Sequence, residues 1–286
     1  MKKILILMTV ALLVAGCKKN DDLAKVRVYV NNFEITQDDL PTRDPQPVAD
    51  YSGIKAVTLA FYTSEGVEYY KTTQLKDDPS TFGTTFGVFD LSLPMASYTM
   101  VAVAYKTQDD SPFTLISPTQ AAYTGAHMLE TFAATQSVTV ANTTALSLTT
   151  TLSRVVSMVK VVSTDGRTAN ASNISITMSG GSKSFNPTTG LASNNNGFIN
   201  TVGISAVVGA TSTSGSYLFL VTDEQSMDIT IDVLDADGAS ISHKEVANVP
   251  FKRNRKTVLT GSLYDASASS SFSVNTEWLT DHTMGF

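Results

Sequence analysis

The sequence predicts an all-β protein of two tandem β-sandwich domains that follow an export signal. Three observations lead to this prediction. Apolar and small polar residues alternate with period two in many short segments, turn residues separate these segments, and no long helical apolar pattern follows residue 22. The chain has 286 residues, which is long for one sandwich of about 100 residues, so we expect two.

The first residues predict export and lipidation. Two lysines follow Met1, and an almost uninterrupted apolar run from Ile4 to Val14 leads to Ala15-Gly16-Cys17. This is the order of a secretory signal, and the run is shorter than the ~20 apolar residues of a membrane-spanning helix. The end of the run, Leu13–Cys17, resembles a bacterial lipobox, in which the cysteine is acylated. Cys17 is the only cysteine in the chain, so we expect residues 1–16 to be a lipoprotein signal peptide and Cys17 to carry the lipid.

Residues 17–25 are predicted to form a lipidated tether. Cys17 is followed by Lys18-Lys19-Asn20-Asp21-Asp22. This pattern resembles the export signals that send some lipoproteins to the outer face of the outer membrane. A solvated spacer that holds the domain away from the headgroups explains the same residues. The two interpretations are compatible, and the export signal places the protein at the outer membrane. In both, the protein is attached through acyl chains rather than through a spanning helix.

Period-two alternation then recurs along the chain. Each such segment puts apolar side chains on one face of a strand and small or polar ones on the other. The clearest segments are Val26–Val30, Val57–Phe61, Val101–Tyr105, Leu146–Leu148, Ile174–Ile176 and Ile229–Val233. Glycine supplies a positive φ without steric cost, so Ser64-Glu65-Gly66, Asp165-Gly166 and Asp237-Gly238 are predicted to be hairpin turns.

The two domains are placed at residues 26–150 and 151–286. Ala145–Val162 is a long strand-like stretch that would pass from one sandwich into the next. The rival architecture is an outer-membrane β-barrel, whose strands need an apolar band flanked by aromatic girdles. An aromatic content of 8% and many Ala and Thr strand positions favour the sandwiches.

The composition excludes several classes of function. With 20 Lys and Arg against 26 Asp and Glu the net charge is -6, which argues against a nucleic-acid partner because phosphate needs a basic face. One cysteine and three distant histidines do not supply a metal cluster. Nucleophile-elbow, zincin, P-loop and dinucleotide-binding patterns are missing from the sequence. We therefore expect no catalytic residues, no metal and no cofactor, and hence no enzyme.

A basic segment near the end of the chain stands out. Four of the five residues Lys252–Lys256 are cations, and the apolar segment Val258–Tyr264 follows. Such a cluster discourages edge-to-edge pairing of strands, and it also suits contact with acidic surfaces.

This segment, with two others, resembles the fimbrillins and FimB-like fimbrial anchor lipoproteins. The matching residues are Pro250 with Arg253–Gly261 and Leu263-Tyr264, the segment Leu152–Val161, and the lipobox with its Lys–Asp tether. The resemblance implies two tandem transthyretin-like (Greek-key) sandwiches and a subunit of type V pili at the outer membrane. It also implies a role in cell adhesion and, as partners, other fimbrial subunits joined by β-strand exchange.

In that family a protease cuts after an arginine and removes the first strand, and the C-terminal strand of a neighbouring subunit fills the groove. Anchor subunits keep the first strand and the lipid. Arg43, in the loop after the first strand, is the candidate cleavage point, with an ordinary loop arginine as the alternative. The resemblance assigns strand exchange to Val26, Val28 and Val30 of the first strand and to Phe272, Val274 and Trp278 of the last. An anchor or accessory subunit is the expected type.

A surface glycan-binding lipoprotein is the alternative function, because it shares the lipobox, the tether and the sandwiches. Its ligand would lie on a host or bacterial surface. Sugar binding of this kind needs exposed aromatic platforms, for which Trp278, Tyr69 and Tyr70 are the candidates. A lone tryptophan packed in a core or an interface is the competing interpretation of Trp278.

Overall fold

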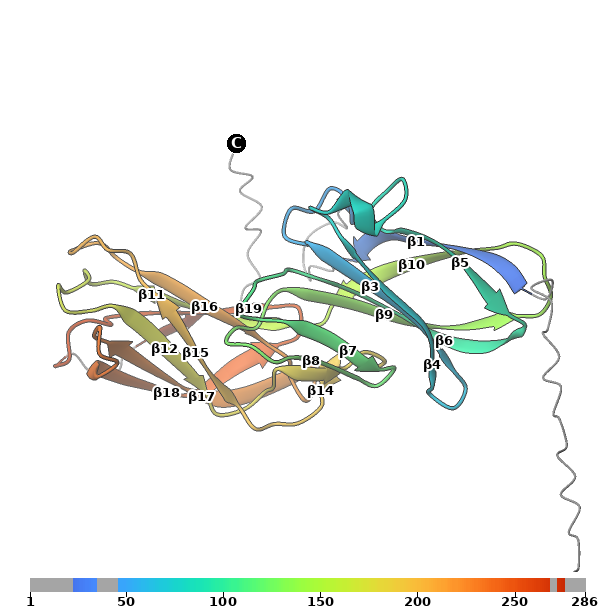
Figure 1. The fold of residues 1–286 in the computed structure, drawn as a ribbon. Helices are drawn as coiled ribbons and strands as arrows, with labels where there is room; N and C mark the ends of the chain where they lie inside the picture. The colour runs from blue at the N-terminus through green and yellow to red at the C-terminus, as the bar shows by residue number, and fades with distance from the viewer. Residues whose placement is uncertain (1–22, 35–45, 268–271, 276–286) are drawn as a thin grey trace, which may run out of the picture.

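The computed structural model describes residues 23–34, 46–267 and 272–275, and the regular secondary structure of these ranges is almost entirely β-strand (Figure 1). Their one helical segment is a 3-10 turn at Pro79–Thr81, so the predicted all-β fold is confirmed. In the described ranges, no helix has the length and apolar character needed to cross a membrane. Cys17, Arg43 and Trp278 lie outside the described residues.

The N-terminal sandwich has two layers. One layer has the order β5-β1-β10, the other has the order β4-β3-β6-β9, and β9 and β10 pair only at Phe132–Ala133 and Ser153–Arg154. The short β2 pairs with the end of β1. The strands are β1 (Leu23–Glu34), β2 (Gln46–Pro47), β3 (Ala56–Thr63), β4 (Glu68–Leu75), β5 (Val88–Pro94), β6 (Ala96–Tyr105), β9 (Thr131–Val140) and β10 (Leu146–Arg154).

The C-terminal sandwich repeats this arrangement. Its layers have the orders β16-β11-β19-β20 and β15-β12-β17-β18. Its first strand, β11, pairs in parallel with β19, as β1 does with β10. The strands are β11 (Ser157–Ser163), β12 (Asn173–Met178), β15 (Phe198–Gly203), β16 (Thr213–Leu218), β17 (Glu224–Leu234), β18 (Ser240–Lys252), β19 (Lys256–Gly261) and β20 (Ser273–Asn275). We propose that the domain boundary predicted near residue 150 lies at 155–156, between β10 and β11.

A third, smaller sheet joins the two sandwiches. The hairpin of β7 (Phe113–Ser117) and β8 (Gln120–Tyr123) is inserted between β6 and β9. Its strand β8 pairs with β13 (Ser184–Asn186), which forms a hairpin with β14 (Leu191–Ala192). Figure 1 shows β7 and β8 lying beside β14 of the C-terminal domain. Each domain therefore contributes one inserted hairpin to a bridging sheet of order β14-β13-β8-β7.

The bridging sheet changes what the outer face of the N-terminal sandwich contacts. On β6, Met100, Ala102 and Ala104 face the N-terminal core. Val101, Val103 and Tyr105 are also buried, in a separate cluster with side chains of the two inserted hairpins. The alternation in this strand predicted one apolar face, whereas the structure buries both faces because the second packs at the domain junction.

The three predicted hairpin turns have different outcomes. Gly66 and Gly238 have φ of 77° and 84° and close the β3–β4 and β17–β18 hairpins, as predicted. The prediction for Asp165-Gly166 is wrong, because β11 and β12 lie in different layers and residues 164–172 connect them.

Asp165 instead holds the end of the C-terminal sandwich. Its carboxylate accepts hydrogen bonds from the backbone N–H groups of Leu263, Tyr264 and Asp265 at 2.8, 2.8 and 2.9 Å and from the Ser262 hydroxyl at 2.7 Å. Burial alone would raise the pKa of Asp165, but these hydrogen bonds outweigh it and the pKa lies below its usual range.

Candidate functional site

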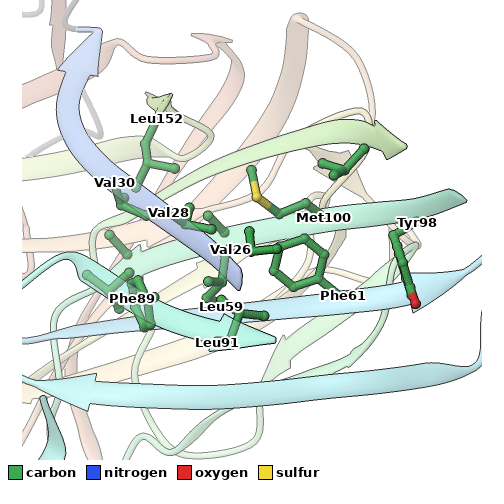
Figure 2. Packing of buried hydrophobic residues seen from close by; sticks show 14 of the residues in the cluster. Val26, Val28, Val30, Leu59, Phe61, Phe89, Leu91, Tyr98, Met100 and Leu152 are labelled. Carbon is green, nitrogen blue, oxygen red and sulfur yellow. The ribbon is translucent and has the colours of Figure 1, made fainter. Parts of the chain in front are cut away.

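The first strand lies in a slot between two others. Along most of its length β1 pairs antiparallel with β5 on one side and parallel with β10 on the other. Val26, Val28 and Val30 are 2%, 0% and 1% exposed. Figure 2 shows these side chains in one layer with Leu59 and Phe61 of the opposite sheet. The predicted inward face of the first strand is therefore confirmed.

The slot depends on β1 for its integrity. Among the described strands, β5 has no ladder partner other than β1. The apolar side chains Phe89, Leu91 and Leu93 of β5 pack in the same core as those of β1. Without β1, β5 would lose its ladder and the core would open along a strand-long groove. A β-strand of alternating apolar side chains has the shape and the hydrogen-bonding groups to fill such a groove.

The outward face of β1 is polar. The Arg27 guanidinium donates to the Asp90 carboxylate of β5 at 2.6 and 2.9 Å, and the hydrogen bond from Arg27 holds the pKa of Asp90 below its usual range. This ion pair is exposed to solvent, and such pairs contribute little stability. The attachment of β1 rests mainly on its ladder and on its buried valines.

The last described strand is less firmly attached. Each of the residues Ser273–Asn275 of β20 pairs with β19, and Val274 is 42% exposed. Phe272 is partly buried because it packs on Gly261, where a Cβ atom would lie 2.7 Å from the Phe272 ring. β20 lies in the C-terminal sandwich and β1 in the N-terminal one, so the two predicted exchange strands do not meet within one molecule.

The two internal segments that resemble fimbrial proteins do meet, at the domain junction. Arg154 ends β10, and its side chain donates from Nη1 to Oδ1 of Asn254, in the β18–β19 turn, at 3.0 Å. Its Nε and Nη2 contact the Glu130 carboxylate at 2.9 and 2.7 Å. The guanidinium also lies 4.9 Å from the centre of the Phe132 ring.

Glu130 and Tyr51 complete this network. The Tyr51 hydroxyl donates to Glu130 at 2.9 Å, and burial with the nearby Glu130 carboxylate raises the pKa of Tyr51 to about 12. Asn254 has a φ of 57°, a left-handed conformation that asparagine tolerates better than most residues. The sequence identified these segments only by resemblance. Their physical role is to tie the N-terminal sheet to a turn of the second sandwich.

Of the candidate sugar platforms, Tyr69 and Tyr70 lie within the described residues, and their rings contact different aromatic side chains. Tyr70 packs its ring against Phe61 of the core at 6.4 Å between centroids. Tyr69 is exposed and contacts the Tyr98 ring at 5.6 Å. No group of three or more His, Cys, Asp and Glu side chains suited to a metal ion occurs within the described residues.

Comparisons with known proteins agree with this architecture. Residues 57–285 match the model of a family described as "Family of unknown function (DUF6562)". No curated protein matches the sequence.

Several solved structures share the fold. A candidate adhesin from Bacteroides ovatus has a TM-score of 0.54 at 11% identity, over 92% of this chain and 96% of its own. The fimbrial anchor protein Mfa2 from Porphyromonas gingivalis has a TM-score of 0.53 at 10% identity, over 88% and 95%. A candidate polysaccharide-binding protein from Bacteroides thetaiotaomicron has a TM-score of 0.53 at 12% identity, over 88% and 96%. At these identities the likeness shows a shared fold.

Proposed function

The chain belongs to DUF6562, a family of unknown function, and we propose that it is a non-enzymatic fimbrial subunit, lipid-anchored at the outer membrane. In this proposal it is of the anchor or accessory type, serves cell adhesion and joins other fimbrial subunits by β-strand exchange. The observation that carries the proposal is the position of β1, a strand that fills a slot between β5 and β10 with its valines in the core.

The proposed lipid site lies close to this strand. Five residues separate Cys17 from Leu23, the first residue of β1. An extended chain spans at most about 3.3–3.6 Å per residue, so the N-terminal end of β1 would stay within about 20 Å of an acylated Cys17. In an anchor subunit, β1 therefore acts both as a core strand and as the connection to the membrane.

The fold of the fimbrial anchor protein Mfa2 supports the proposal. The weakly attached β20, with Phe272 partly buried and Val274 exposed, supports the C-terminal segment as a strand that another subunit can take up. In the sequence, Trp278 keeps the period-two spacing of Phe272 and Val274.

The decisive measurement is the N-terminal residue and lipid state of the protein taken from outer membranes. An acylated Cys17 with the chain intact beyond Arg43 is the expected result. A mature chain that starts at Asp44 would show a processed pilin and refute the anchor type. Cys17→Ser should move the protein out of the membrane fraction, and Arg43→Gln should leave it there.

Assembly is tested by purifying pilus fibres from cells with and without the protein. Full-length protein should co-purify with the fibres, and cells that lack it should shed more fibre into the medium. Recovery only as a free monomer, with fibre shedding unchanged, would refute the proposed function.

A further inference from the structure

An open cleft lies at the domain junction and is separate from the strand slot. It has a volume of about 670 Å³, within the roughly 300–1,000 Å³ of small-molecule sites. The ends of β9 and β10 form one wall and three turns of the C-terminal domain form the other. The lining ranges are 133–135, 153–155, 187–190, 223–224 and 252–255.

The cleft is built from interlocked parts of both domains. Arg154, one of the lining residues, is held by Glu130 and Asn254. Arg253, also in the lining, donates to the Thr189 carbonyl at 2.8 Å. Gly190, with a φ of 72°, makes room for this contact, because a Cβ there would lie 2.7 Å from Nη1 of Arg253. The walls are therefore preformed, as ligand sites usually are.

The charge of the lining favours an anion. Lys252, Arg253 and Arg255 line the cleft against two carboxylates, those of Asp223 and Glu224, in a chain whose net charge is -6. The fourth lining cation, Arg154, is buried and already balanced by Glu130. The two carboxylates pair with Arg253 and Lys252 at 2.8 and 3.1 Å, and both are largely exposed. A ligand carboxylate or sulfate can replace such solvent-exposed partners, and arginine binds these groups through two parallel hydrogen bonds.

The hydroxyl groups of the lining favour a sugar. Thr135 donates its hydroxyl hydrogen to the Pro187 carbonyl at 3.2 Å, and Thr188 donates to the Pro118 carbonyl at 3.0 Å. Each hydroxyl oxygen keeps lone pairs that can accept hydrogen bonds from a ligand. Aromatic side chains are not among the lining residues, so stacking on the face of a neutral sugar is not the basis of recognition here.

We propose that this cleft binds an acidic oligosaccharide. Its carboxylate or sulfate groups contact Lys252, Arg253 and Arg255, and its hydroxyl groups donate to Thr135 and Thr188. As the ligand site of an adhesive surface protein, the cleft rests on the proposed function. The binding chemistry itself requires neither the lipid nor strand exchange.

The test is calorimetry on the full-length protein in mild detergent. The probes are an oligogalacturonate, a sulfated heparin fragment, the neutral maltotetraose and a polyglutamate peptide. One or both acidic saccharides should bind, and their affinity should fall at high salt. Maltotetraose should bind at least about tenfold more weakly than the acidic saccharides, the factor expected for one lost charge-assisted hydrogen bond. The two acidic probes separate a carboxylate preference from a sulfate preference.

The variants locate the site. Lys252→Gln and Arg253→Gln should each weaken acidic saccharide binding about tenfold. Lys71→Gln, which removes a lysine from a similar ion pair with Glu68 on β4, should leave binding unchanged. Thr188→Val tests the hydroxyl contribution without changing the charge, and should weaken the saccharides but not polyglutamate.

Three results would overturn the inference: no binding of either acidic saccharide, binding that the cleft variants leave unchanged, or polyglutamate binding as tightly as the saccharides. Each of these results leaves Cys17 acylation and co-purification with fibres unaffected. A failure of the cleft is thus distinguishable from a failure of the fimbrial role.

Discussion

Replacing Arg154 by methionine should destabilise the protein by about 3 kcal/mol. The Arg154 and Glu130 side chains are 2% and 8% exposed and lie 2.7 Å apart. Removing one partner of a buried ion pair costs about 3–5 kcal/mol, because the other charge stays buried. We expect the lower end of this range, since the Tyr51 hydroxyl still donates to Glu130 at 2.9 Å. A loss of this size is a large fraction of the ~5–15 kcal/mol that stabilises a typical domain.

Urea denaturation measures this loss, with far-UV circular dichroism and tyrosine fluorescence as two probes whose curves should coincide. Glu130→Gln is the second single variant, and the double variant completes a thermodynamic cycle. Arg154→Met/Glu130→Gln should recover most of the stability, because no unpaired charge is then buried. A loss below about 1 kcal/mol for Arg154→Met, or a double variant as unstable as the sum of the single ones, would refute the argument.

Three further predictions concern the turns and the pH dependence. Gly190→Ala should cost about 1–2 kcal/mol in thermal unfolding, because of its positive φ and its contact with Arg253. Gly203→Ala should be nearly neutral, because a Cβ there would make only an ordinary van der Waals contact with Asn173 at 3.9 Å. Asp165→Ala should lower the free energy of unfolding by about 1–3 kcal/mol. Because the pKa of Asp165 is lowered on folding, the stability that this carboxylate contributes is present at neutral pH and should fade as pH falls below about 4. The pKa of Tyr51 is near 10 in the unfolded chain and about 12 in the folded protein. The free energy of unfolding should therefore fall above about pH 10, by up to about 1.4 kcal/mol per pH unit. In urea titrations, Tyr51→Phe should reduce this slope.

The fold class and the inward face of β1 could be predicted because they follow from local alternation. Val26, Val28 and Val30 alternate with polar neighbours, and the structure buries all three. The same rule was incomplete for β6, where Val103 faces the bridging sheet and Ala102 faces the core. Burial on both faces depends on hairpins far along the chain, which no local period encodes.

The domain junction could not be predicted for the same reason. Arg154 and Asn254 are 100 residues apart in sequence, yet Nη1 of Arg154 lies 3.0 Å from Oδ1 of Asn254. A resemblance can identify both segments, but only the folded chain shows that they contact each other. The cleft beside them is equally non-local, because its lining comes from five separate segments.

The strand slot and the domain junction are connected through β10. This strand pairs with β1 from Leu146 to Ser153 and then ends in Arg154. The ladder between β1 and β10 therefore extends to Ser153, the residue directly before the junction arginine Arg154. The bridging sheet makes its ladder contacts through β8 and β13, with no ladder to β1 or β10 in the described residues. The two sandwiches are thus joined by the Arg154 network, which shares β10 with the slot, and by the ladders of the bridging sheet, which do not. An exchange of β1 would therefore act directly on the first and not on the ladders of the second.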